Sequence, residues 1–399
     1  MSKSSSNKKY SYFLMLGHLA TDLNQGALAA IFPFLILYGG YSYFQVAVLL
    51  FAANIVSGII QPLFGYLNDK KPRPWLMALG VLFAGFGMAG VGFFENYYLI
   101  VASAMVSGVG IALFHPEGGR LANLVADTSK ARGMSVFAVG GNAGFAIGPI
   151  LVAVFVSLFG LHGALIFILP SVLWAALMLP MNKTFLLLGS AGEAKIPQNA
   201  NEHWSAFSIA MFVMSCRSII TYASSAYIPL FMVAMLSTSE AVASTSITVL
   251  SVLGAVATFF SGRVNDKIGV EKLMIGSFAL LTVLFIAFSF NSSLVIAVVL
   301  VALIGVFNNA PYPSVVACAQ GFVPNHLGMA SGLIYGVVVC VGGIVSPLLG
   351  NVGDTIGLVP LMMCVAGFAL LALVSSIVLS VALRYVKKQD VQAFTGDNR

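Results

Sequence analysis

Two stretches of the sequence nearly repeat each other: residues 65–71, which read GYLNDKK, and residues 262–269, which read GRVNDKIG. Their aspartates, Asp69 and Asp266, lie 197 positions apart in a chain of 399 residues. Each stretch follows a long apolar run and precedes another one. A charged turn between two apolar helices that recurs at half the chain length indicates that a unit of six helices occurs twice.

The composition is that of an integral membrane protein. Hydrophobic residues make up 59% of the chain and charged residues only 8%, whereas soluble domains carry about 25% charged residues. The apolar runs do not alternate with the period of two that a β-barrel strand requires. We therefore predict an all-α membrane protein with twelve transmembrane helices. At about 20 residues for each crossing, they fall roughly at residues 11–37, 43–67, 75–94, 97–125, 133–159, 162–187, 205–236, 241–264, 271–290, 293–320, 328–350 and 357–385.

The basic residues predict the orientation of the chain. With twelve spans, every lysine and arginine outside the helices falls on one side, and the opposite turns carry only Glu95, Glu240 and Asp354. Because basic residues collect on the cytoplasmic side, both termini are expected there. The net charge of +6 then reflects this topology, and we expect no nucleic-acid partner.

The prolines repeat the pattern of the two charged turns. They pair at offsets of 196 to 198 positions: Pro33 with Pro229, Pro116 with Pro313, and Pro149 with Pro347. Parallel duplication relates two such bundles by an axis along the membrane normal. We predict a first six-helix bundle at residues 1–187, a cytoplasmic linker at residues 188–204, and a second bundle with a short cytoplasmic tail at residues 205–399.

The chain carries no pattern typical of an enzyme. It has no phosphate-binding loop, no zinc-ligand spacing and no nucleophile elbow. Its four cysteines, Cys216, Cys318, Cys340 and Cys364, all fall within apolar runs, where thiols usually act as small apolar side chains. We expect neither an enzyme nor a metal site or cofactor, and transport driven by a proton gradient in place of ATP.

Four segments of the first half carry a resemblance to a known family. They are residues 18–25 (HLATDLNQ), 61–69 (QPLFGYLND), 114–120 (FHPEGGR) and 139–149 (VGGNAGFAIGP). With the paired charged turns, they resemble the major facilitator superfamily, and within it the fosmidomycin-resistance family of bacterial exporters. The resemblance implies a multi-pass inner-membrane transporter that works by alternating access and whose partners are a small molecule, protons and the lipid bilayer. A monomer is the default expectation. The chain departs from many drug exporters at Ala104, where those carry an arginine, so a proton relay through that arginine is not carried over.

Ionisable side chains inside the predicted helices are the candidates for proton coupling, because charges are costly within a membrane. His18 and Asp22 are four residues apart and share a helix face. His115 and Glu117 lie in the fourth predicted helix, where Glu117 can pair with Arg120. The alternatives are that Asp22 is hydrogen-bonded to helix neighbours and that Glu117 and Arg120 form a self-neutralised pair that fixes helix geometry.

Arg217, about twelve residues into the seventh predicted helix, is the main candidate for substrate binding. An arginine near the bilayer midplane needs an anionic partner, and its planar fork suits a carboxylate or phosphonate. That partner is either Asp22 or Glu117, which makes a structural ion pair, or the substrate. Further candidate contacts with the substrate are Arg120, Gln25, Asn142, Tyr222, Tyr312 and Tyr335.

By resemblance, the two charged turns are gating elements. Their candidate residues are Asp69, Asp266, Lys70, Lys267, Gly65 and Gly262, since a carboxylate at such a turn can engage the N-terminus of a neighbouring helix. A solvated turn is the alternative. Gly140, Gly144 and Gly148, followed by Pro149, form a small-residue face that predicts close helix packing.

These residues predict proton-coupled export of a small drug or metabolite. The predicted substrates include anions such as a phosphonate antibiotic. Protonation of Asp22 or Glu117 would release Arg217 or Arg120 and favour one facing state. A proton-coupled importer of an organic anion is a second hypothesis, because the same buried charges would serve it. A third is a non-transporting sensor or a lipid-handling protein on the same fold.

Overall fold

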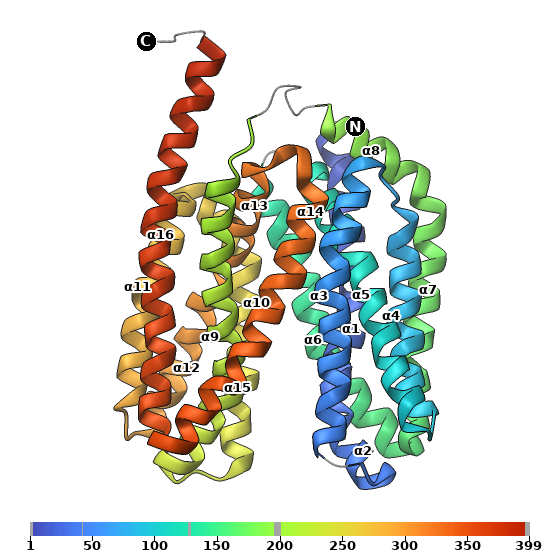
Figure 1. Cartoon of the computed structure of the whole chain (residues 1–399), viewed down its shortest axis with the longest axis vertical. Helices are drawn as coiled ribbons and strands as arrows, with labels where there is room; N and C mark the ends of the chain where they lie inside the picture. The colour runs from blue at the N-terminus through green and yellow to red at the C-terminus, as the bar shows by residue number, and fades with distance from the viewer. Residues whose placement is uncertain (1–2, 42, 127–128, 195–200, 396–399) are drawn as a thin grey trace. The chain divides into compact units, whose positions relative to one another are not determined.

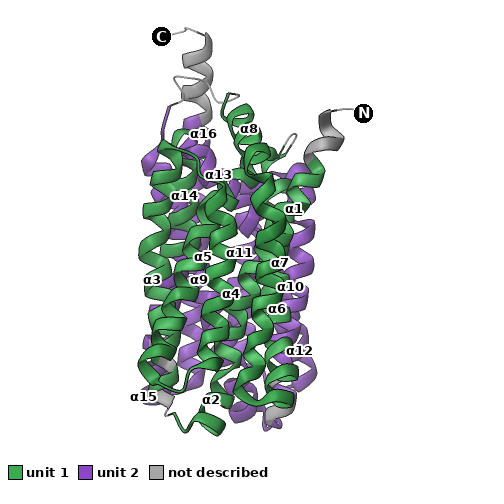
Figure 2. Cartoon of the chain, turned by 90° about the vertical axis from the view of Figure 1, so that its right-hand side faces the viewer, with its two compact units in different colours: residues 1–197, 325–337 green, residues 198–324, 338–399 purple. Residues whose placement is uncertain are grey.

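The structure is a computed structural model that describes residues 3–41, 43–126, 129–194 and 201–395. No strand occurs within these ranges, so the predicted all-α fold is confirmed. The chain divides into two compact units, shown in separate colours in Figure 2. Unit 1 comprises residues 1–197 and 325–337, and unit 2 comprises residues 198–324 and 338–399.

Unit 1 is built around one central helix, α5. Twenty-one of the 29 residues of α5 are buried, and it packs against α1, α3, α4, α8 and α14. The Asn96 side chain caps its start by accepting the backbone N–H groups of Tyr98 and Leu99, which satisfies two donors that a helix start otherwise leaves unpaired. The helices of unit 1 (Figure 1) are α1 (Lys3–Ala30), α2 (Phe32–Gly39), α3 (Tyr43–Lys70), α4 (Trp75–Phe93), α5 (Tyr97–Val125), α6 (Lys130–Phe159), η1 (Gly160–Phe167), α7 (Ile168–Met178), η2 (Leu179–Met181), α8 (Asn182–Glu193), α14 (Leu327–Gly332) and the π-helical turn η4 (Leu333–Val337).

Unit 2 packs around α9, which contacts α16 and α15. The predicted run at 293–320 is split into two helices next to Pro311, because proline lacks the N–H that would continue the helix. The helices of unit 2 are α9 (Trp204–Leu236), α10 (Glu240–Ile268), α11 (Val270–Ser289), α12 (Leu294–Asn309), α13 (Tyr312–Phe322), α15 (Val338–Ile356) and α16 (Leu358–Thr395); a short 3-10 turn, η3 (Pro324–His326), precedes α14.

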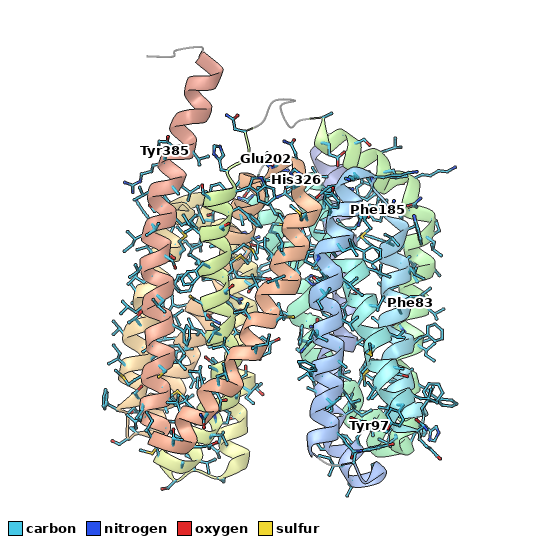
Figure 3. The ribbon with its side chains drawn as sticks, viewed as in Figure 1. Phe83, Tyr97, Phe185, Glu202, His326 and Tyr385 are labelled. Atoms are coloured by element: carbon cyan, nitrogen blue, oxygen red, sulfur yellow. The ribbon has the colours of Figure 1, made fainter. Side chains whose placement is uncertain are left out.

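The outer faces of the helices are apolar. Large apolar side chains such as Phe83 and Tyr385, both labelled in Figure 3, are exposed. Within the described ranges, ten helices are long and apolar enough to cross a membrane, or eleven if the bent pair α1 and α2 is one span. One of the ten, Lys130–Glu193, has 64 residues and contains α6, α7 and α8 as separate helices. The count of twelve spans and the cytoplasmic termini therefore stay predictions.

Three segments differ from the sequence prediction. The first predicted run, 11–37, is broken at Ile31, where α1 and α2 meet at an angle of 47°, beside Pro33, which lies in the first turn of α2. Helix α8 continues to Glu193, inside the predicted linker at 188–204, of which residues 195–200 lie outside the described ranges. Residues 325–337, predicted in the second bundle, belong to unit 1, because Asp69 of α3 binds the start of α14.

Candidate functional site

One group of ionisable side chains in unit 1 joins α1 to α5. His18 and Asp22 of α1 and His115 of α5 are all buried. His18 Nε2 lies 3.1 Å from Asp22 Oδ2, and His115 Nε2 lies 3.1 Å from Asp22 Oδ1. The two Nε2 atoms are themselves 3.1 Å apart. The structure thus brings together three of the four residues predicted for proton coupling, including the predicted pair on one face of α1.

Backbone carbonyls and aromatic rings hold the two imidazoles in place. Nδ1 of His18 is 2.8 Å from the carbonyl oxygen of Phe137, and Nδ1 of His115 is 3.0 Å from that of Ile111. The ring of Phe137 stacks on His18 with centroids 4.1 Å apart, and the ring of Tyr335 stacks on His115 at 5.4 Å. Tyr335, predicted as a substrate contact, therefore packs against this cluster.

The fourth predicted proton-coupling residue, Glu117, belongs to a separate ion pair. Arg120 donates from Nε to Glu117 Oε2 at 3.0 Å and from Nη2 to Glu117 Oε1 at 2.7 Å. Its Nη1 donates to the carboxylate of Glu193 on α8. Arg120 and Glu117 are almost completely buried. The sequence alternative of a self-neutralised pair matches this geometry, and Arg120, predicted as a substrate contact, is enclosed by carboxylates of its own unit.

Glu193 is a residue that sequence reasoning missed. It lies 73 residues from Arg120, within the cytoplasmic linker predicted at residues 188–204. Glu193 carries a charge in a polar stretch, and nothing in its local sequence sets it apart from neighbouring linker residues. Only the continuation of α8 brings its carboxylate to Arg120.

In unit 2, neutral groups surround Arg217 of α9. Its Nε donates to the backbone carbonyl of Asn308 at 2.8 Å, and Nη2 donates to Asn309 Oδ1 at 2.9 Å. The guanidinium carbon lies 4.1 Å from the centroid of the Tyr312 ring. Among the described residues of unit 2, Arg217 has no carboxylate partner and its Nη1 makes no hydrogen bond. The carboxylates predicted as its partner, Asp22 and Glu117, belong to unit 1, where His18, His115 and Arg120 engage them. Their pairing with Arg217 stays a prediction.

The two charged turns differ in the structure. Asp69 is partly buried and accepts the backbone N–H groups of Gly328 and Met329 at 2.6 and 2.8 Å. Asp266 and Lys267 are exposed. Lys70 lies over the ring of Tyr66, with Nζ 4.4 Å from the centroid.

Glycines allow the close approaches in unit 1. A Cβ at Gly65 would meet the backbone of Gly328, and Cβ atoms at Gly140, Gly144 and Gly148 would meet the backbone of α1. Hence α6 packs on α1 through the small-residue face that precedes Pro149.

The comparison with known proteins decides the family. A family model described as Major Facilitator Superfamily matches residues 14–347 and 207–396. The chain belongs to this superfamily. As a superfamily member it is a membrane transporter, and the predicted resemblance is confirmed.

Curated relatives cover most of the chain. This chain is 29% identical over 377 residues to the uncharacterized MFS-type transporter YfnC of Bacillus subtilis, and the match covers 92% of each protein. It is 25% identical over 347 residues to the fosmidomycin resistance protein of Escherichia coli, covering 86% of this chain and 85% of that protein. Among solved structures, the E. coli fucose:proton symporter FucP matches with a TM-score of 0.74 at 14% identity, over 95% of this chain and 99% of FucP. A bacterial homologue of the iron transporter ferroportin matches with a TM-score of 0.72 at 16% identity, over 93% and 99%. At these identities the structural matches show the fold alone.

The remaining predicted residues of this superfamily member are spread over both units. Gln25 and Asn142 are half-buried on α1 and α6 of unit 1. Tyr222 is half-buried on α9, where it lies close to Gly342 of α15. Gly262 is buried on α10 of unit 2. Their roles in binding and gating stay predictions.

Proposed function

We propose that this transporter exports a small anionic drug or metabolite, such as a phosphonate antibiotic, in exchange for protons across a bacterial inner membrane. Membership of the superfamily supports transport of a small molecule. The relative named for fosmidomycin resistance supports export and a phosphonate. A protein of Yersinia enterocolitica named multidrug resistance protein MdtG, 25% identical over 362 residues, supports a drug as substrate.

The single observation that supports an anionic substrate is the environment of Arg217. A cation taken out of water is costly unless charge or hydrogen bonds compensate it. Here a carbonyl, an amide and an aromatic ring contact the guanidinium. These neutral groups orient it, but they do not neutralise its positive charge. The two N–H groups of Nη1 remain to donate to an oxyanion. A phosphonate or carboxylate supplies both the negative charge and the acceptor oxygens.

Proton exchange is the source of energy in this proposal. The chain carries no nucleotide-binding loop, and in our proposal an ion gradient drives the uphill step. The buried groups able to exchange protons in the described part of unit 1 are His18, Asp22, His115 and Glu117. A ligand drives alternating access only through its different affinity for the two states.

Reconstitution tests the proposal. The purified protein is placed in proteoliposomes that enclose a pH-sensitive dye, and fosmidomycin is added on one side under an imposed pH gradient. We expect proton flux triggered by fosmidomycin, its loss in Arg217→Gln, and partial retention in Arg217→Lys, which keeps the charge but loses the fork. Arg384→Gln is the matched control, because the Arg384 side chain is 74% exposed. Equal flux in wild type and Arg217→Gln would overturn the role of Arg217. Counterflow that loads the substrate only from outside would favour the importer.

A further inference from the structure

The hydrogen-bond partners of the two buried histidines fix where their protons lie. His18 Nδ1 and His115 Nδ1 each face a backbone carbonyl oxygen, which only accepts hydrogen bonds. Each Nδ1 therefore carries the ring proton, and in a neutral imidazole the other nitrogen, Nε2, then presents a lone pair. Both lone pairs point into the space beside Asp22.

Three acceptors consequently converge in a buried site. The two Nε2 atoms lie 3.1 Å apart, and each lies 3.1 Å from a different oxygen of the Asp22 carboxylate. Asp22 Oδ1 makes no hydrogen bond within the described residues. One proton on one Nε2 would satisfy a single pair of the three and leave the other Nε2 facing a carboxylate oxygen. A cation that all three groups ligate at once removes every one of these repulsions.

We propose that His18, Asp22 and His115 form a binding site for a divalent first-row transition metal ion of the Zn²⁺, Fe²⁺ or Co²⁺ type. The three residues offer ligand atoms that all lie within 4.8 Å of one another. Metal–nitrogen bonds of about 2.0–2.1 Å would span the 3.1 Å between the two Nε2 atoms at a nitrogen–metal–nitrogen angle of about 95–100°. Each Nε2 also faces a different oxygen of the Asp22 carboxylate at 3.1 Å, so the carboxylate lies where it can bind the same ion. Two imidazoles and one carboxylate on one side of an ion form a facial set that leaves other positions open.

The surroundings also match those of metal-binding histidines. Such histidines commonly donate their second ring N–H to a backbone carbonyl, which fixes the tautomer and orients the ring. Phe137 and Ile111 supply these carbonyls. The nitrogen ligands favour a transition metal over Mg²⁺ or Ca²⁺, which prefer oxygen.

Gly141 of α6 leaves the room that the ion needs. A Cβ at this position would lie 2.7 Å from Asp22 Oδ2 and 2.8 Å from His18 Nε2. A methyl group there would occupy space directly beside the ligand atoms. Gly141→Ala therefore disturbs the site while it retains every ligand.

Metal ions bind the deprotonated forms of these ligands, so ion and protons would compete for the same atoms. The sequence showed no zinc-ligand spacing, because His115 lies 97 residues from His18 and only the packing of α1 on α5 joins them.

Metal titration of the purified full-length protein in detergent tests the site. Metal-stripped protein is titrated with Co²⁺, followed by its visible absorption, and with Zn²⁺, followed by calorimetry. We expect one ion per chain in wild type. We expect His115→Gln and Asp22→Asn to weaken binding about 100-fold or more, since even changes outside the ligand set typically cost 10- to 100-fold.

Two further variants keep the test decisive. His162→Gln alters an exposed histidine of η1 and is expected to bind as wild type does. Gly141→Ala is expected to weaken metal binding while all three ligands are retained. It therefore tests the site even if a ligand variant fails to fold. Wild type should also gain thermal stability with Zn²⁺, as should His162→Gln, whereas Gly141→Ala should not. Absence of binding in wild type, or equal binding in wild type, His115→Gln and Gly141→Ala, would overturn the proposal.

Discussion

The carboxylate of Asp69 accepts the backbone N–H of Gly328 at 2.6 Å, across 259 positions of sequence. Its second oxygen accepts the N–H of Met329 at 2.8 Å. One aspartate thus pairs two donors at the start of α14 and ties residues 325–337 to α3. Asp266, its repeat counterpart in sequence, is exposed, so the two halves differ at the feature that they share most clearly in sequence.

We expect Asp69→Asn to loosen α14. Asparagine has one acceptor oxygen, so one of the two N–H groups would face an amide NH₂, at a cost of about 1–2 kcal/mol, which is typical of a lost helix cap or a buried unpaired group. Hydrogen exchange should rise in residues 327–337 and the melting temperature in detergent should fall. Asp266→Asn serves as control, with unchanged exchange in that segment. Equal protection in Asp69→Asn and wild type would show that the hydrogen bonds contribute little.

Gly65→Ala should damage the same contact by a different route. The added Cβ would meet the carbonyl group of Gly328 and the Cα of Met329, and backbone atoms cannot move aside as a flexible side chain can. We expect a marked loss of thermal stability. Gly367→Ala in α16 is the matched control, because nothing lies within 4 Å of its Cβ position. Alanine there should stabilise the helix by about 0.5–1 kcal/mol. A tolerated Gly65→Ala would mean that α3 and α14 are less closely packed than described.

Much of the fold follows from local sequence. Long apolar runs predict the helices, since a bilayer leaves few other ways to satisfy backbone groups. Pro33 and Pro311 lie where predicted runs break into two helices. Membership of residues 325–337 in unit 1 was not predictable, because it depends on contacts of Asp69 and Gly65 more than 250 residues away.

Individual residues of the candidate site could be predicted from the sequence, but most of the contacts between them could not. His18 and Asp22 share a helix face by spacing alone, and Glu117 and Arg120 can pair at three residues apart. The joining of His115 to Asp22, and of Glu193 to Arg120, depends on how α1, α5 and α8 pack. Asn308 and Asn309 accept hydrogen bonds from Arg217. The sequence does not predict these contacts, because they depend on the packing of α9 against α12.

Substrate affinity should depend on the neighbours of Arg217 as well as on its charge. Asn309→Ala removes the Oδ1 acceptor of Nη2 and leaves the guanidinium less well oriented. We expect a several-fold rise in KM for the anionic substrate with a smaller change in maximal rate, and a greater loss in Arg217→Gln. Initial rates of fosmidomycin uptake into inverted vesicles measure both quantities. Asn291→Ala, in the turn before α12, is the control. An unchanged KM in Asn309→Ala would contradict the orienting role.

Arg120, Glu117 and Glu193 form a cluster that should follow the energetics of buried ion pairs. Arg120→Met leaves the carboxylate of Glu117 buried without its cation, which typically costs about 3–5 kcal/mol. The double variant Glu117→Gln with Arg120→Met removes both charges and should be more stable than Arg120→Met alone. Glu193→Gln should cost less than about 1 kcal/mol, since the Glu193 side chain is 41% exposed. Unfolding in detergent, combined as a double-mutant cycle, measures the coupling. Additive effects of the two substitutions would show that Glu117 and Arg120 do not stabilise each other, and the cluster would then have to be explained by the conformational cycle of the transporter.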